Sequence, residues 1–191
     1  MKHLPFIILT GVILTSCGGN TTSIANENQN PLTAARYGDE RADALANLII
    51  TADPIVEKDG MREKIQKEIE QAKNIGSAAR TELSVGSMGA LIPITDDASG
   101  FVALIDTTLY FSSDFFVSPG MDMRVYLTTI VDPRDVPFPD ESAINVGVLQ
   151  SVYGAHSYGL SDDVTEKDLR TVVLYDQGLG RIASFAQLSK R

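Results

Sequence analysis

Apolar side chains recur at helical spacing in the region that follows residue 38. One stripe consists of Leu45, Leu48, Ile49 and Ala52, and a second consists of Met61, Ile65, Ile69 and Ala72. Asp53 and Pro54 lie between the stripes and are typical of a helix start, with Asp as N-cap and Pro at the first helical position. The pattern predicts a short helical segment over residues 39–81.

We expect the two helices of this segment to pack against the domain that follows. A coiled-coil stalk or a partner-binding hairpin is the alternative. The stripes are short for a coiled coil, which needs several heptads, so packing on the domain is the prediction.

From Val85 onward the helical period gives way to alternation. Met123, Val125 and Leu127 alternate with other residues in the pattern of a half-buried strand. Further candidate strands cover residues 101–105, 107–111, 144–149, 155–158, 169–176 and 181–188. Many short strands separated by Gly, Pro and Asp turns, without strand–helix alternation, predict a mainly β fold. We expect an antiparallel β-sandwich over residues 85–188, preceded by the short helical segment.

The first residues indicate export. A basic start at residues 1–3 is followed by an apolar run over residues 4–14 that is too short to span a bilayer, which is typical of a secretory signal peptide over residues 1–16. Leu14-Thr-Ser-Cys17 resembles the lipobox of bacterial lipoproteins. That resemblance implies cleavage before Cys17 and lipid modification, including a palmitate chain, on this cysteine. An ordinary signal peptide with an incidental cysteine is the alternative.

The residues after Cys17 favour a location on the envelope. Residues 17–38, which begin with the lipidated cysteine, are rich in Gly, Asn, Thr and Ser and predict a flexible tether. Several acyl chains make such an anchor stable. Gly18 rather than Asp follows the cysteine, so we expect a lipid-anchored protein of the bacterial cell envelope at the outer membrane.

Charge and residue usage exclude several classes of function. The chain holds 25 acidic and 16 basic residues, a formal net charge of −9, which argues against nucleic acid as a partner. Cys17 is the only cysteine, and lipidation would leave no disulfide, thiolate ligand or cysteine nucleophile. His156 is the only histidine beyond residue 3, so no metal site and no catalytic constellation is predicted, and we expect no enzyme activity.

The β region resembles the DM13 domain. The resemblance rests on the order of several runs, which are Ser99–Leu104, Leu109–Phe115, Ser118–Leu127, Ile144–Leu149, Tyr153–Tyr158 and residues 172–188. It implies an all-β module, often on secreted or membrane-anchored proteins, that serves electron transfer through a cysteine acting as a thiol or as a haem ligand.

The chain departs from this family at the cysteine, which follows an aromatic residue near the end of the penultimate strand. Here the aromatic residue is Tyr175 and the next residue is Asp176, whose carboxylate has no thiol chemistry. A bound cofactor held through His156, Met121, Met123 or Tyr175 is the remaining redox route, and haem held by His with Met is one form of it. Core packing is the expected role of Met123.

The candidate ligand or redox residues are Tyr175, Asp176, His156, Tyr153 and Tyr158. Each also has a structural interpretation: a hydrogen-bonded histidine, a turn aspartate or a packed tyrosine. The loop over residues 132–141 concentrates oxygen ligands that suit calcium, but its prolines and spacing favour a stiff solvated loop. No cofactor is predicted.

Two functions therefore follow from the sequence. The prediction is a non-catalytic envelope lipoprotein whose β domain binds a protein, a glycan or a small ligand. The alternative is an electron-transfer lipoprotein that uses a bound cofactor without the family cysteine.

Overall fold

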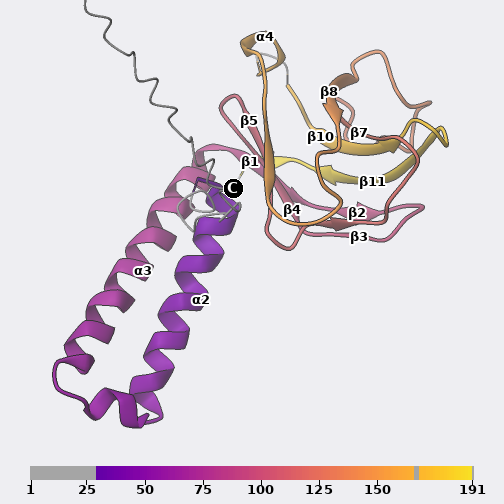
Figure 1. Ribbon diagram of the computed structural model, residues 1–191. Coiled ribbons are helices and arrows are strands. Elements are labelled where there is room, and N and C mark those ends of the chain that lie inside the picture. The colour runs from indigo at the N-terminus through magenta and orange to yellow at the C-terminus, as the bar shows by residue number, and fades with distance from the viewer. Residues whose placement is uncertain (1–28, 166–167, 191) are drawn as a thin grey trace, which may run out of the picture.

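The computed structural model describes residues 29–165 and 168–190 (Figure 1). The predicted signal peptide (1–16), Cys17 and the tether as far as residue 28 lie outside the described residues. In the described part of the chain, no helix has the length and apolar character needed to cross a membrane.

A helical hairpin precedes the strands. Helix α2 (Pro31–Ile50) is joined to α3 (Met61–Val85) through the 3₁₀ helix η1 (Pro54–Glu57). Helical structure thus begins before the predicted residue 39 and continues past the predicted residue 81.

The predicted tether boundary at residue 38 is wrong because Asn30 starts a helix. Its Oδ1 accepts hydrogen bonds from the backbone N–H groups of Leu32 at 3.0 Å and Thr33 at 3.4 Å, and Pro31 occupies the first helical position. The Asn30 amide also donates to the Phe111 carbonyl at 2.7 Å, which fixes the start of the helix on a strand.

The two helices pack closely through small residues. A Cβ atom on Gly38 would lie 2.5 Å from the Gly76 backbone nitrogen and 2.6 Å from the Ala72 carbonyl oxygen, so the helix backbones meet here. Ala42 and Ile65 are buried farther along the same hairpin. Of the apolar stripes seen in the sequence, Ile65 and Ala72 are buried, Leu45, Leu48, Ile49, Met61 and Ile69 are half-buried, and Ala52 is exposed.

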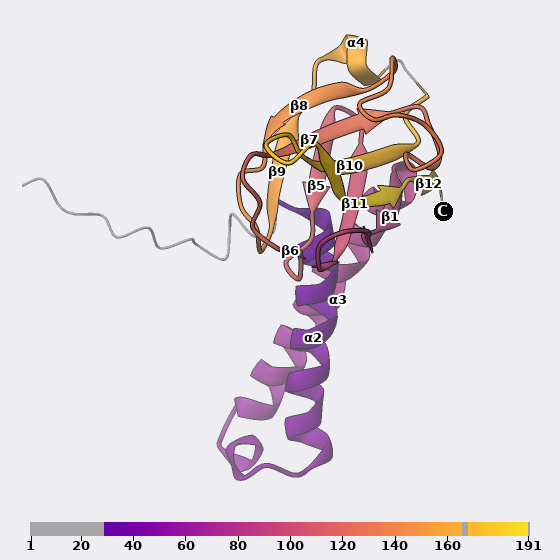
Figure 2. The ribbon, with the colours of Figure 1, turned by 90° about the vertical axis from the view of Figure 1, so that its right-hand side faces the viewer.

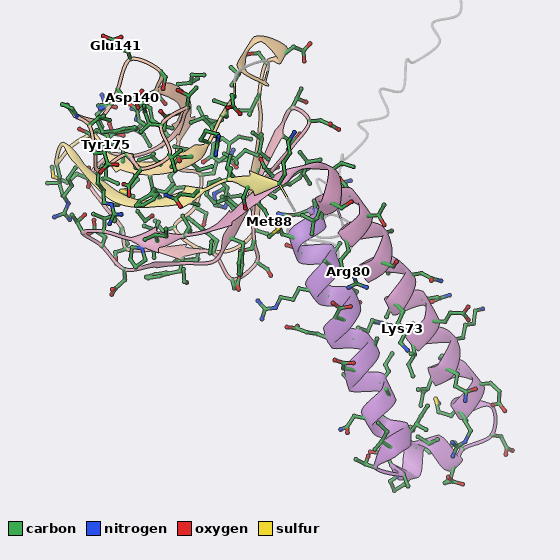
Figure 3. The ribbon with its side chains drawn as sticks, turned by 180° about the vertical axis from the view of Figure 1, so that it is seen from behind. Lys73, Arg80, Met88, Asp140, Glu141 and Tyr175 are labelled. Atoms are coloured by element: carbon green, nitrogen blue, oxygen red, sulfur yellow. The ribbon has the colours of Figure 1, made fainter. Side chains whose placement is uncertain are left out.

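The hairpin, residues 31–85, projects from the β domain, and we call it the helical arm (Figures 1 and 2). Only its base contacts a sheet, through a cluster of Leu83, Ala103 and Ile105 against which Leu32, Ala35, Met88 and Tyr110 pack (Figure 3). The expected packing of the two helices on the domain is limited to the base of the arm, and beyond the base the helices pack against each other.

The strands form a sandwich-like pair of antiparallel sheets, which confirms the predicted fold class. In sheet order, the first sheet has β12 (Ser189–Lys190), β1 (Ser87–Ala90), β4 (Phe101–Ile105), β5 (Thr108–Phe111) and β9 (His156–Gly159). The second has β2 (Ile92–Pro93), β11 (Arg181–Gln187), β10 (Thr171–Asp176), β7 (Met123–Thr128) and β8 (Ile144–Val148). Strands β3 (Ala98–Ser99) and β6 (Phe116–Val117) pair separately, and α4 (Asp162–Thr165) precedes β10.

The main core lies between the two sheets. Leu109 and Phe111 of β5 meet Val125, Leu127 and Leu174 of the second sheet, and all five side chains are fully buried. Burying such side chains is worth about 1.5–3 kcal/mol each, which makes this layer the principal source of stability.

A separate, mostly aromatic cluster covers the outer face of the second sheet. It contains Tyr126, Val173, Tyr175 and Phe185, and Phe138 from the loop after β7 packs against it. Every residue of β10 is consequently buried, on both faces of the strand.

Replacing Gly38 with Ala should destabilise the helical arm. The added methyl group meets backbone atoms that cannot rotate away, so overpacking outweighs the helix propensity of Ala and costs about 1–2 kcal/mol net. Urea unfolding followed by circular dichroism at 222 nm measures the loss. The matched control Ser77→Ala, at an exposed site of α3, should change stability by less than about 0.5 kcal/mol, and equal midpoints for the two variants would contradict the close approach.

Candidate functional site

Strand β10 positions two of the candidate residues on opposite faces of one sheet. Tyr175 pairs with Arg124 across β7 and points to the outer aromatic cluster. Asp176 is the next residue, so its side chain points the other way, and it is fully buried. The two neighbours therefore belong to different sites.

The Asp176 carboxylate joins two loops. Its Oδ2 accepts the backbone N–H of Met121 at 2.9 Å, and its Oδ1 accepts those of Asp122 at 3.2 Å and Leu179 at 3.1 Å. Burial by itself raises the pKa of Asp176, but backbone N–H groups of Met121, Asp122, Leu179 and Gly178 lower it, and the net pKa lies below its usual value. The ionised carboxylate holds the loop before β7 against the turn after β10.

Two glycines allow this close packing. A Cβ atom on Gly120 would overlap Oδ2 of Asp176, and one on Gly178 would lie 2.7 Å from Cβ of Met121. At the position where the resemblance places a cysteine, the chain thus holds an enclosed carboxylate that is already surrounded by its own backbone donors.

Tyr175 borders a pocket of about 290 Å³, which we call the Tyr175 pocket. Its lining consists of Ile94, Thr95, Pro133, Arg134, Val136, Phe138, Tyr175, Gly180, Arg181 and Ile182. The Tyr175 ring lies 5.9 Å from Tyr126 and 5.4 Å from Phe138, centroid to centroid. Figure 3 shows Tyr175 on the part of the β domain remote from the helical arm.

Both arginines of this pocket are held by aspartates. Arg134 Nε donates to Asp132 Oδ1 at 2.8 Å, its Nη2 donates to Asp132 Oδ2, and its guanidinium lies 5.3 Å from the centroid of the Phe185 ring. This pairing lowers the pKa of Asp132 to about 2. Arg181 Nη2 lies 2.8 and 3.1 Å from the two carboxylate oxygens of Asp96.

The loop that was considered for calcium uses its oxygens internally. Asp140 accepts from the Thr128 hydroxyl at 2.8 Å and from the Ser142 hydroxyl at 2.6 Å. Burial raises the pKa of Asp140, but these hydrogen bonds lower it by more. Within the described residues, three or more His, Cys, Asp or Glu side chains do not gather into a metal-binding group anywhere.

His156 lies inside an aromatic cluster on β9. Its ring stacks on Phe111 at 4.4 Å and 7° and meets the edge of Phe115 at 5.0 Å. Nδ1 lies 2.9 Å from the Gly154 carbonyl oxygen, whereas Nε2 is buried and has no hydrogen-bond partner. Burial lowers the pKa of His156, and the contact with Gly154 opposes this shift only in part.

Tyr158, on the same strand, holds neighbouring backbone segments together through its hydroxyl. Its hydroxyl accepts the Gln150 N–H at 2.8 Å and donates to the Val148 carbonyl at 3.0 Å. Burial raises the pKa of Tyr158, with the Gln150 hydrogen bond acting in the opposite direction. Its hydroxyl therefore connects β9 to the end of β8.

A haem does not fit these residues. Nε2 of His156 is enclosed by packed rings, Met123 is buried in the main core, and Met121 is 74% exposed on a loop. Joint axial ligation by His and Met would require both side chains to face one open cavity. His156 is not among the residues that line the Tyr175 pocket.

Tyr153 stands apart from the other candidates. It is 68% exposed and forms an isolated antiparallel bridge with Phe116, which is 39% exposed. The structure thus brings His156 and Tyr158 together and leaves Tyr153, Tyr175 and Asp176 in three other places. Sequence reasoning missed Arg134 and Arg181, since no local pattern joins a loop arginine to one that starts a distant strand.

Replacing Asp176 with Asn should destabilise the β domain strongly. The amide nitrogen would face backbone N–H donors, and one acceptor oxygen would be lost inside the fold. We expect the melting temperature at pH 7 to fall by more than about 5 °C, measured by differential scanning calorimetry. Asp168→Asn is the matched control, since the Asp168 side chain is 88% exposed and should change the melting temperature by less than about 1 °C. A similar, small effect of both substitutions would show that the carboxylate does not hold the loops.

Stability should decrease on mild acidification because of His156. A lowered folded-state pKa means that its contribution is present above the unfolded-state pKa of about 6.5 and is lost as the pH falls through the folded-state value. The wild-type urea midpoint should therefore be lower at pH 5.5 than at pH 7.5. In His156→Phe, which keeps a ring on Phe111, this difference should shrink by at least about half. The pKa values of Asp132 and Asp176 are lowered, so these carboxylates stay ionised between pH 5.5 and pH 7.5 and do not cause the difference. An unchanged pH dependence in His156→Phe would exclude His156 as the cause.

Comparison of the sequence with known protein families gives one match. The model of the family described as Electron transfer DM13 matches residues 93–187, from the end of β2 to the end of β11. No curated protein and no solved structure matches the chain. The family match covers nearly the whole sandwich and leaves out the helical arm. Through residues 93–187 the chain belongs to the DM13 family.

Proposed function

We propose that this chain is a lipid-anchored protein of the bacterial envelope whose DM13 domain binds a ligand or partner without catalysis. One observation carries the proposal. At the position where the resemblance places the family's cysteine, the chain has Asp176, a buried carboxylate that accepts hydrogen bonds from the backbone of Met121, Asp122 and Leu179.

Electron transfer needs a group that changes its oxidation state, and a carboxylate does not do so. Cys17 is the only cysteine of the chain, and the lipobox resemblance assigns its sulfur to a thioether with lipid. His156 has one ring nitrogen against the Gly154 carbonyl and the other enclosed by packed rings. The chain's own side chains thus support binding better than redox chemistry.

Anchoring is supported by the order of segments along the chain. The lipobox-like Leu14–Cys17 and the polar residues after it precede Asn30, whose side chain bonds the Phe111 carbonyl of β5. Twelve residues separate Cys17 from Asn30, and a chain of this length reaches at most about 40 Å when fully extended. The β domain would therefore sit close to the membrane and meet partners in the envelope.

The description of the family favours electron transfer through a bound cofactor as the second function. The two functions differ in one optical property, since a haem or flavin absorbs visible light and changes its spectrum on reduction, whereas a non-redox binding domain does not.

The protein purified from its native membrane should have a featureless visible spectrum before and after dithionite, and added haemin should produce no stoichiometric Soret shift. His156→Phe, which keeps a ring on Phe111, gives the comparison for non-specific haem binding, because a haem ligated through His156 should lose its Soret shift in this variant. A dithionite-sensitive band at a stoichiometry near one per chain would overturn the binding proposal and support the cofactor route.

A further inference from the structure

We propose that the Tyr175 pocket binds a small organic carboxylate carried on an apolar body. The inference rests on the proposed function, because it gives that binding domain a site and a class of ligand. It follows from three properties of the pocket: an unpartnered hydroxyl, unused guanidinium donors and apolar walls.

The hydroxyl belongs to Tyr175, whose side chain is enclosed by the aromatic cluster. The residue is only 8% exposed and lines the pocket, yet among the described residues its hydroxyl has no hydrogen-bond partner. Tyr126 of the same cluster is buried to a similar degree, but its hydroxyl accepts from the Asn145 amide at 3.3 Å. The Tyr175 hydroxyl is not among the enclosed polar atoms that lack a partner, so it opens on the pocket, where it can bond to solvent or to a ligand. The Tyr175 hydroxyl is therefore left for a molecule that enters the pocket.

The two arginines supply further donors. Asp96 engages only Nη2 of Arg181, so the Nε and Nη1 donors of this residue have no partner in the described structure. Asp132 engages Nε and Nη2 of Arg134, which leaves its Nη1. The aspartates also hold each guanidinium in one orientation, which lowers the entropy cost of binding a ligand.

These donors select the charge of the ligand. Asp96 and Asp132 balance the charges of the two arginines but do not line the pocket, so the polar side-chain groups of Arg134, Arg181 and Tyr175 face a ligand mainly as N–H and O–H donors. A carboxylate can accept from a guanidinium and a hydroxyl together, and such charge-assisted hydrogen bonds are stronger than neutral ones. An acceptor anion is the ligand that satisfies the groups left unpaired.

The walls and the volume of the pocket determine the size and polarity of the rest of the ligand. Ile94, Val136, Phe138 and Ile182 present apolar surface beside the donors. A volume of about 290 Å³ is at the lower end of the range of known ligand pockets, so the ligand is small. A flat or branched apolar group can pack on Phe138 while its carboxylate reaches the donors.

The test uses 3-phenylpropionate and its neutral counterpart 3-phenylpropan-1-ol as probes. Titrations of ¹⁵N-labelled protein should shift amide signals of residues 134–136, Phe138 and residues 180–182, with the carboxylate binding at least about five-fold more tightly than the alcohol. Tyr175→Phe should weaken carboxylate binding about three- to ten-fold. Tyr126→Phe is the matched control, since its hydroxyl lies outside the pocket lining, and it should bind like the wild type.

Three outcomes overturn the inference: equal affinity for acid and alcohol, unchanged affinity in Tyr175→Phe, or shifts confined to other parts of the domain. The comparison of the two probes on the wild-type protein remains decisive if a variant fails to fold. Failure here is distinguishable from failure of the proposed function. A negative titration with a featureless visible spectrum removes only this ligand class, whereas a redox-active band removes the binding proposal whatever the titration shows.

Discussion

The ionised carboxylate of Asp176 is buried at the end of β10, and the loops around it are arranged to make that burial tolerable. An unpaired carboxylate in this place would be strongly unfavourable, and backbone N–H groups from the loop before β7 and the turn after β10 provide the compensation. Gly120 and Gly178 are needed because larger residues would occupy the space of the carboxylate or of Met121. The same turn continues into Gly180 and Arg181, which line the Tyr175 pocket, so the geometry of the pocket depends on the carboxylate behind it.

Strand β10 shows how one segment can serve structure and binding together. Its inner side chains, such as Leu174, complete the main core, while its outer side chains join the cluster around Tyr126. The loop after β7 covers this outer face through Phe138 and carries Arg134 to the same place. The end of this strand, where Tyr175 and Asp176 are neighbours, thereby supports the core on one face and the Tyr175 pocket on the other.

The alternation of apolar residues was enough to predict the sandwich, because strands such as β7 have a periodicity that no helix can satisfy. The start of α2 was predicted too late because polar composition around Asn30 obscured an N-cap followed by proline, although both signals are local. The role of Asp176 was not predictable, since its partners come from residues 121 and 122 as well as from the adjacent turn. The Tyr175 pocket was equally hidden, because Ile94, Arg134 and Arg181 meet only when three separate segments fold together.

Asn30 also links the start of the helical arm directly to the sandwich. Its side chain caps α2 and donates to the Phe111 carbonyl at 2.7 Å, so a displacement of this residue is transmitted to β5 as well as to the helix. The helical arm, about 30 Å long for a helix of 20 residues, extends away from this link (Figure 1). A displacement at Asn30 therefore reaches the sandwich without passing along the length of the arm.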